Sequence, residues 1–105
     1  MAVQDQGLWL HFKLSNSAFG TNEERDRFHA LEDVVSIALF ESGVGEYDGN
    51  EIGSGEFSMF MLGSSADRML AVALRALSDF PIPAGSFAIK RYGPPGSREE
   101  TVQLV

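Results

Sequence analysis

The sequence contains no cysteine among its 105 residues. This absence excludes disulfide bridges, thiolate zinc sites and thiol nucleophiles. Long apolar runs are also missing: the longest block, from Val34 to Phe40, is interrupted by Ser36 and is far shorter than the roughly 20 residues of a membrane span. Residues 1–6 show no basic region followed by an apolar stretch. We therefore expect a cytoplasmic protein without a signal peptide or a membrane span.

Positive charge is the scarcer charge in this chain. Eight lysines and arginines stand against fifteen acidic residues, which gives a net charge of −7. Such a balance repels nucleic acid and anionic lipid at long range, so neither is expected as the main partner. The apolar fraction of 44% and the charged fraction of 22% are ordinary for a globular protein. We expect residues 1–105 to form a single domain.

The order of the helices and strands follows from hydrophobic periodicity. Apolar and polar residues alternate over residues 8–14, which predicts a half-buried strand. Helical spacing predicts helices over residues 22–42, with Gly43 as the stop, and from residue 66 to about residue 78. Further strands are predicted over residues 44–48, 56–62 and 86–92, and residues 101–105 are expected to form either a short extra strand or a loose tail.

This β-α-β-β-α-β order resembles that of the ferredoxin-like fold. The resemblance implies an α+β sandwich in which a four-stranded antiparallel sheet of order 4-1-3-2 carries both helices on one face. The other face of the sheet is then left open. Many unrelated functions use this fold, so the resemblance by itself implies no activity.

One segment, residues 46–57, combines acidic residues with glycines. Its members are Glu46, Asp48, Glu51, Glu56, Gly49, Gly53 and Gly55. The pair Asp48-Gly49 predicts a tight hairpin turn, because glycine readily takes the positive φ that such turns need. We therefore expect an acidic hairpin loop at one end of the sheet, of unassigned role.

The same segment has only a poor match to a calcium-binding loop. Ile52 stands at a ligand position, and Met59 stands where such a loop needs a bidentate glutamate. We expect no bound metal and no other cofactor. Residues 47–57 and 90–93 also resemble segments of a group of small uncharacterised bacterial proteins with the ferredoxin-like fold, and this resemblance implies no activity.

Strict alternation assigns Phe87 and Ile89 to the inner face of the last main strand. It assigns seven side chains to the open face of the sheet: Trp9, His11, Lys13, Ser58, Phe60, Lys90 and Tyr92. An apolar patch around Trp9, Phe60 and Tyr92 predicts an interface, because homodimers commonly bury such patches by two-fold symmetry. The expected function is a non-catalytic interaction module that self-associates, or binds a protein partner, through this face.

Two alternatives stay open for this face. Two sheets that face each other in a dimer can enclose a cleft, and Trp9, His11, Lys13 and Tyr92 would then line a small-molecule or enzymatic site. RNA binding is the less favoured alternative. RNA-recognition domains stack bases on such aromatic residues, but residues 56–62 lack the basic residue and the glycine-aromatic spacing of that family's motif. No nucleophile motif or phosphate loop is present, so no catalytic residue is assigned.

Overall fold

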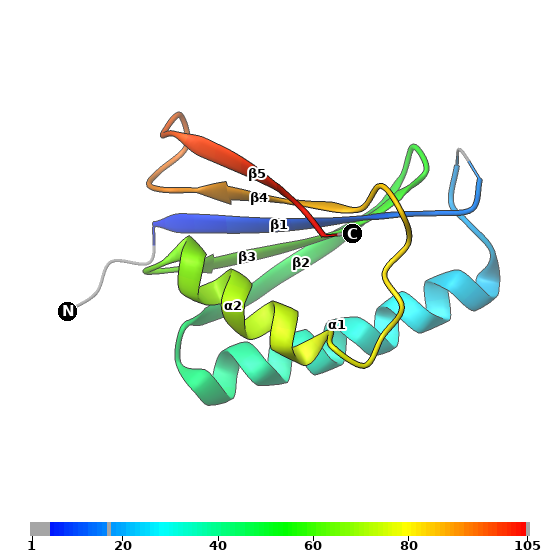
Figure 1. The fold of residues 1–105 in the computed structure, drawn as a ribbon, viewed down its shortest axis with the longest axis horizontal. Helices are drawn as coiled ribbons and strands as arrows, with labels where there is room; N and C mark the ends of the chain where they lie inside the picture. Colours follow the sequence, from blue (N-terminus) through cyan, green and yellow to red (C-terminus); the bar gives the residue numbers. More distant parts are fainter. Residues whose placement is uncertain (1–4, 17, 105) are drawn as a thin grey trace.

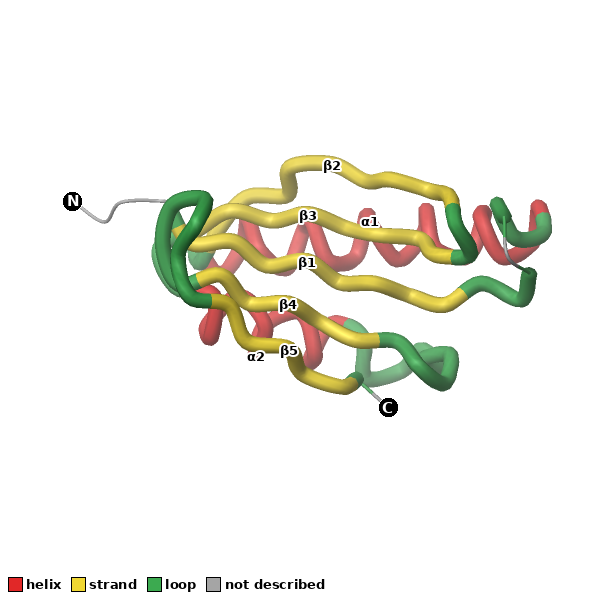
Figure 2. The backbone as a smooth tube through the Cα atoms, turned by 90° about the horizontal axis from the view of Figure 1, so that it is seen from above, coloured by secondary structure: helices red, strands yellow, loops and turns green. Residues whose placement is uncertain are grey.

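The computed structural model describes residues 5–16 and 18–104. Residues 1–4, which enter the expectation about a signal peptide, and Val105, the end of the predicted last strand, lie outside the described residues. The described residues form two layers, an antiparallel sheet and a pair of helices (Figure 1). Figure 2 shows the sheet in front of the helices, so one face of the sheet carries both helices and the other carries none. The predicted α+β class is confirmed.

The elements follow one another as β1 (Gln6–Lys13), α1 (Asn22–Ser42), β2 (Gly45–Gly53), β3 (Glu56–Gly63), α2 (Ala66–Ala76), β4 (Phe87–Arg91) and β5 (Glu99–Gln103). Helix α1 begins with a capping box, in which Thr21 accepts from the amide of Glu24 while the Glu24 carboxylate accepts from the amide of Thr21. It ends at Gly43, whose φ of +69° is the left-handed cap that the sequence predicts. No helix formed by the described residues is long and apolar enough to cross a membrane.

The sheet has five strands in the order β2-β3-β1-β4-β5. The predicted four-stranded order of 4-1-3-2 differs from it, because β5 extends the sheet beyond β4. A turn at residues 93–98 returns the chain along the free edge of β4, where Phe87 to Arg91 pair with Gln103 to Glu99. The fifth strand therefore spans Glu99–Gln103 instead of residues 101–105. Strand β1 lies at the centre, between β3 and β4.

The hairpin between β2 and β3 turns at Ser54 and Gly55, so the predicted turn at Asp48-Gly49 is wrong. Both turn residues have positive φ, 53° and 77°, as a two-residue hairpin turn of type I′ requires. Asp48 and Gly49 lie inside β2, where the register with β3 shifts between Tyr47 and Gly49. Gly49 does have a positive φ, +136°, but it serves a β-bulge and not a turn.

The predicted acidic loop is therefore an acidic edge of the sheet. Glu46, Asp48 and Glu51 are exposed on β2, which has a neighbour on one side only. Glu56 is the first residue of β3, the strand next to β2, and it pairs with Gly53 of β2 on one side and with Lys13 of β1 on the other. Charged side chains and a bulge on an edge strand oppose pairing with further strands, which gives these acids a structural role.

The bulge turns two side chains of β2 toward α1. Tyr47 pairs with Met61 and Asn50 with Met59, two core positions of β3, although Tyr47 and Asn50 are three residues apart and would face opposite sides of a regular strand. Both donate to Oε2 of Glu32 in α1, Asn50 Nδ2 at 2.7 Å and Tyr47 through its hydroxyl. Glu32, only 8% exposed, is thus held by donors from the neighbouring strand.

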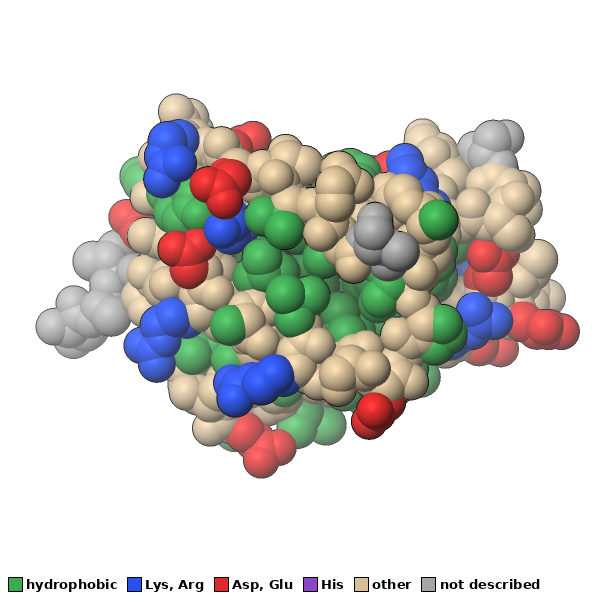
Figure 3. All heavy atoms as spheres, in the orientation of Figure 1, with side chains coloured by type: hydrophobic (Ala, Val, Ile, Leu, Met, Phe, Trp, Pro, Cys, Tyr) green, Lys and Arg blue, Asp and Glu red, His purple; other side chains and the backbone are tan. Residues whose placement is uncertain are grey.

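Apolar side chains of β1, β3 and both helices form the core. Phe28 of α1 stacks between Phe12 and Phe57, at centroid distances of 5.2 and 5.3 Å. Figure 3 shows apolar side chains gathered at the centre of one side of the molecule, between the sheet and the helices. Partly buried residues, among them Phe80, Ile82, Val102 and Leu104, pack against the core.

Candidate functional site

Strand β4 faces the opposite way from the prediction. Ala88, fully buried, pairs with the core residue Leu10, and Lys90 pairs with the core residue Leu8. Lys90 and Tyr92 therefore lie on the helix side of the sheet and not on its open face. The predicted inner residues, Phe87 and Ile89, are instead on the open face, because they pair with His11 and Trp9.

Two carboxylates from other elements hold the side chain of Lys90 on the helix side of the sheet. Its Nζ lies 2.8 Å from Asp67 Oδ1 at the start of α2 and 3.0 Å from Glu100 Oε1 of β5. The hydroxyl of Tyr92 also donates to Asp67 Oδ1, at 2.8 Å. The hydrogen bond with Asp67 is the main reason why the pKa of Lys90 lies above its usual value, and it lowers the pKa of Asp67 in turn.

The other predicted side chains do lie together on the open face. Trp9 pairs with Phe60, and His11 pairs with Ser58, on the side of the sheet away from the helices. The open face of the sheet therefore carries Trp9, His11, Lys13, Ser58, Phe60, Phe87, Ile89 and Arg91. Arg91 lies on the open face because Lys90, its neighbour in the chain, lies on the helix side.

His11 and Lys13 both lie close to a carboxylate of the same chain. Lys13 Nζ lies 2.7 Å from Glu56 Oε2, and His11 Nδ1 lies 3.4 Å from Glu56 Oε1. His11 Nδ1 also lies 2.8 Å from Ser58 Oγ, so the serine and the carboxylate approach the same ring nitrogen. A catalytic relay needs them on opposite ring nitrogens, with the carboxylate orienting the base and the base activating the serine. The arrangement therefore does not form a nucleophile relay.

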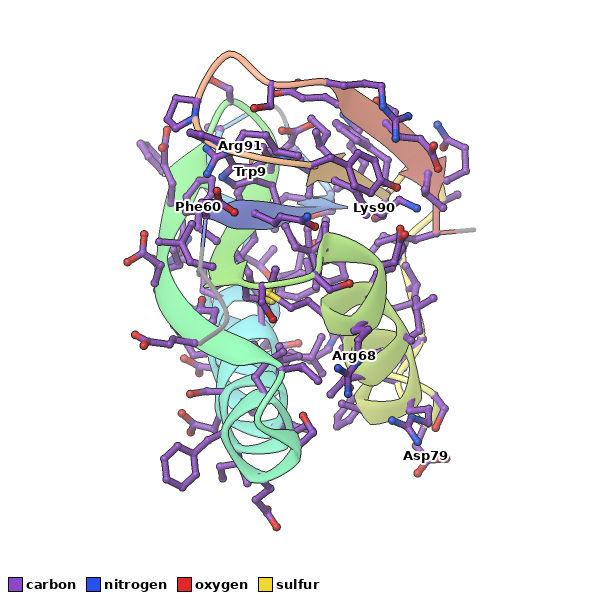
Figure 4. All side chains as sticks on the ribbon, turned by 90° about the vertical axis from the view of Figure 1, so that its left-hand side faces the viewer. Trp9, Phe60, Arg68, Asp79, Lys90 and Arg91 are labelled. Carbon is purple, nitrogen blue, oxygen red and sulfur yellow. The ribbon has the colours of Figure 1, made fainter. Side chains whose placement is uncertain are left out.

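Trp9, Phe60 and Arg91 form a second cluster at the other end of the open face. The rings of Trp9 and Phe60 meet edge to face, with centroids 6.5 Å apart, and Arg91 Cζ lies 5.2 Å from the centre of the Trp9 ring. Figure 4 shows the three side chains together at one corner of the sheet, with Lys90 apart from them and closer to α2.

The guanidinium of Arg91 is buried without a countercharge. The residue is only 9% exposed. Its Nε donates to the carbonyl of Gly93 at 2.7 Å, and its Nη2 makes a long contact of 3.4 Å with the carbonyl of Asp5. Over residues 5–16 and 18–104, no carboxylate forms an ion pair with Arg91. A mostly buried charge is rarely left in this state unless something else offsets it.

This cluster borders a pocket of about 430 Å³, a size typical of small-molecule sites. The pocket is lined by Asp5, Trp9, Asp48, Phe60, Met61, Leu62, Arg91, Pro94 and Pro95. The loop between β4 and β5 supplies the two prolines, and Figure 2 shows this loop at the end of the sheet, across the neighbouring strands. The pocket combines aromatic walls, one buried cation and two carboxylates.

A second hollow, of about 470 Å³, lies between α1 and α2. It is lined by Ala38, Ser42, Val72 and Ala76, and by two exposed residues of opposite charge, Glu41 and Arg75. It offers no aromatic ring and no buried charge, so we take the pocket beside Arg91 as the candidate site.

Sequence reasoning missed Arg91, Asp5 and the two prolines as site residues. Arg91 directly follows Lys90 in the chain. A shift of the predicted alternation by one residue therefore places Arg91 on the open face and Lys90 on the helix side. The one available signal was Ala88, a small residue suited to the crowded side of a sheet covered by helices. Trp9 and Phe60 were identified correctly as neighbours on the open face.

Among the residues that the structure describes, no three histidine, aspartate or glutamate side chains are grouped so that they could hold a metal ion. Comparisons of the chain with family models, with curated proteins and with solved structures give no match. The function must therefore be inferred from the geometry of the site.

Proposed function

We propose that this chain is a binding module that holds a small organic anion in the pocket around Trp9, Phe60 and Arg91. The observation that carries the proposal is the buried guanidinium, which has no carboxylate partner among the described residues and borders an open pocket. A ligand carboxylate would supply the missing countercharge. Arginine suits this task because its planar fork of N–H groups matches the two oxygens of a carboxylate.

The remaining donors of Arg91 support this interpretation. Nε and Nη2 are directed at backbone oxygens, and no described residue accepts a hydrogen bond from Nη1. No buried side-chain nitrogen or oxygen of the described residues lacks a partner, so Nη1 is accessible to solvent. The backbone contacts fix the guanidinium in place, and the free N–H groups can then bind a ligand without reorganisation.

The walls of the pocket indicate the rest of the ligand. The edge-to-face pair of Trp9 and Phe60, together with Leu62 and the two prolines, presents mostly apolar surface. Apolar walls with a few placed polar groups are typical of sites for small organic molecules. A ligand with one ring or a short apolar body and one acidic group fits this chemistry. This site lies within one chain and does not need the cleft between two copies that the sequence suggested.

Trp9 is the only tryptophan of the chain, so its fluorescence reports on this pocket alone. We expect 3-phenylpropionate, which carries one ring and one carboxylate, to change the Trp9 emission in a saturable titration. Arg91→Gln should weaken binding about tenfold or more, because losing a charged hydrogen-bond partner costs about 1.5–3 kcal/mol. Lys90→Gln is the matched control: it removes the same charge from the next residue, on the opposite side of the sheet, and should leave the affinity unchanged.

Thermal unfolding of each variant establishes that it is folded. Arg91→Lys keeps the positive charge but loses the planar fork of N–H groups, so its affinity should lie between those of the wild type and Arg91→Gln. Equal losses in Arg91→Gln and Lys90→Gln would show that only net charge matters. No saturable change in the wild type with either millimolar 3-phenylpropionate or its α-amino derivative, L-phenylalanine, would also count against the proposed site.

Association through the open face is a second candidate function. It is favoured by four apolar side chains that are partly exposed on this face, Trp9, Phe60, Phe87 and Ile89. The more exposed large apolar residues lie elsewhere, however, and Phe40 of α1 is 84% exposed. Light scattering would compare the wild type with Trp9→Glu and Phe40→Glu. Association through the sheet predicts an oligomer that only Trp9→Glu dissociates, and a wild-type monomer at high micromolar concentration would rule out self-association.

We also propose that the fold is ferredoxin-like with an added fifth strand. The arrangement of β1 to β4 supports this, since β1 is flanked by β3 and β4 and both helices cover one face. Relationship to the group of small bacterial proteins, and a cytoplasmic location, stay predictions from the sequence.

A further inference from the structure

We infer that the ligand of this pocket is a zwitterion, with a cationic group close to the carboxylate that Arg91 binds. This inference rests on the proposed function. Its starting point is that Asp5 and Asp48 both line the pocket. Within residues 5–16 and 18–104, neither forms an ion pair or a side-chain hydrogen bond. The pocket therefore presents both signs of charge, and none of the three groups has an ion-pair partner among the described residues.

The strand order keeps these charges apart. Arg91 follows from β4 and Asp48 from β2, and β1 and β3 lie between them. Arg91 extends back over Trp9 of β1, while Asp48, the extra residue of the bulge, lies beside Phe60 of β3. Neighbouring strands are about 4.8 Å apart, so β1, whose Trp9 ring lies against the guanidinium, is roughly 10 Å from β2, the strand of Asp48. Trp9 and Phe60, which line the same pocket, come from the two strands in between.

An α-amino acid has charges that fit such a pocket. Its carboxylate and ammonium groups are attached to the same carbon, and each can form a charge-assisted hydrogen bond of about 2.8 Å, one with Arg91 and one with Asp48. The side chain of the amino acid would then lie against Trp9 and Phe60. Asp5, whose carbonyl contacts Arg91, is the second acid available to the ammonium group.

The acids also act by repulsion. A ligand with only a carboxylate would bring its charge close to two aspartates in a protein of net charge −7, and a ligand with only an ammonium group would meet Arg91. Unfavourable charge contacts of this kind give specificity against the wrong ligands. The two aspartates alone would be ordinary solvated side chains. The nine-tenths buried cation that borders the same pocket is what makes them part of a site.

Three probes that differ by one group test this inference: L-phenylalanine, 3-phenylpropionate, which lacks the amino group, and 2-phenylethylamine, which lacks the carboxylate. Titrations followed by Trp9 fluorescence should show L-phenylalanine binding at least about tenfold more tightly than either analogue. Asp48→Asn should change the affinities for L-phenylalanine and 3-phenylpropionate in opposite directions. It should weaken the binding of L-phenylalanine several-fold, because the ammonium group loses its partner. It should strengthen the binding of 3-phenylpropionate, because a negative charge no longer lies close to the ligand carboxylate.

Glu51→Gln is the matched control, since it removes an exposed carboxylate from the same strand outside the pocket, and it should change neither affinity. If 3-phenylpropionate binds as tightly as L-phenylalanine and Arg91→Gln weakens both, the zwitterion inference is overturned while the anion site stands. The same holds if Asp48→Asn weakens both acids alike. If no probe binds the wild-type protein, the proposed function itself fails.

Discussion

Replacement of Gly63 by alanine is expected to lower the free energy of unfolding by about 3 kcal/mol or more. Gly63 pairs with Gly45 where β2 and β3 meet beneath Met69 of α2. A Cβ atom on Gly63 would lie 2.4 Å from the carbonyl oxygen of Val44 and 2.8 Å from the sulfur of Met69. The methionine can move, but the carbonyl belongs to the backbone, so the strands would have to separate. Urea unfolding followed by circular dichroism measures the loss.

Gly53→Ala provides the control for this prediction. Gly53 is the last residue of β2, and a Cβ atom there would meet only a ring carbon of Phe19, at 4.0 Å. Its unfolding midpoint should stay close to that of the wild type, because surface substitutions without a clash usually change stability by less than about 0.5 kcal/mol. If Gly63→Ala were as stable as Gly53→Ala, the close packing of the two strands against α2 would be refuted.

The second large effect is expected for Glu32→Gln, which should cost about 2 kcal/mol at neutral pH. Glu32 accepts hydrogen bonds from Tyr47 and Asn50, and its other oxygen lies 2.6 Å from His29 Nδ1. The oxygen of a glutamine can still accept from Tyr47 and Asn50, but these hydrogen bonds lose the negative charge that strengthens them, and an N–H group replaces the acceptor beside His29. The same substitution at the exposed Glu51 should change stability by less than about 0.5 kcal/mol, as measured by urea unfolding.

The cost of Glu32→Gln should also depend on pH. Burial raises the pKa of Glu32, but the hydrogen bonds from Tyr47 and Asn50, with the neighbouring His29, outweigh burial and leave the pKa below its usual value of 4.5. A carboxyl whose pKa is lowered by folding stabilises the fold above the unfolded-state value, and this contribution is lost as the pH falls through the folded-state value. The stability difference between wild type and Glu32→Gln should thus shrink as the pH falls below about 4.5. A difference that grows in acid would contradict the assignment.

The parts of the fold that the sequence predicted correctly rest on local signals. Helix α1 follows from the capping box of Thr21 and Glu24 and from the left-handed cap at Gly43, which involve residues close in the chain. The sides of β1 and β3 that point to the core follow from the alternation of apolar and polar residues along each strand. This alternation correctly predicted that Trp9 and Phe60 share the open face.

The hairpin turn could not be chosen from the sequence, because two glycine signals compete in one segment. Asp48-Gly49 is the stronger local turn signal, yet the chain turns at Ser54-Gly55. The longer β2 that results pairs along all of β3 and carries the bulge that directs Tyr47 and Asn50 at Glu32. That network joins residues of α1 and β2, so it is absent from any local pattern.

The candidate site was only half predicted for a related reason. On hydrophobicity alone, Phe87 and Ile89 are better inner residues than Ala88 and Lys90. Lys90 is nevertheless on the helix side, because Asp67 and Glu100, far from it in the chain, neutralise its charge there. Arg91 is consequently on the open face, and apart from the small size of Ala88 no local feature of the sequence indicates that this cation borders the pocket.

The most direct test of the proposed site is an NMR titration of the ¹⁵N-labelled wild-type protein with L-phenylalanine. We expect the largest shift changes at the side-chain N–H groups of Trp9 and Arg91 and at the amides of residues around Asp48, Phe60 and Gly93, which come together only at the pocket. Residues His11, Lys13 and Glu56 at the other end of the open face, and those of the hollow between α1 and α2, should change little. Saturable changes centred on those regions, or none at all at millimolar ligand, would contradict the assignment of the pocket beside Arg91 as the binding site.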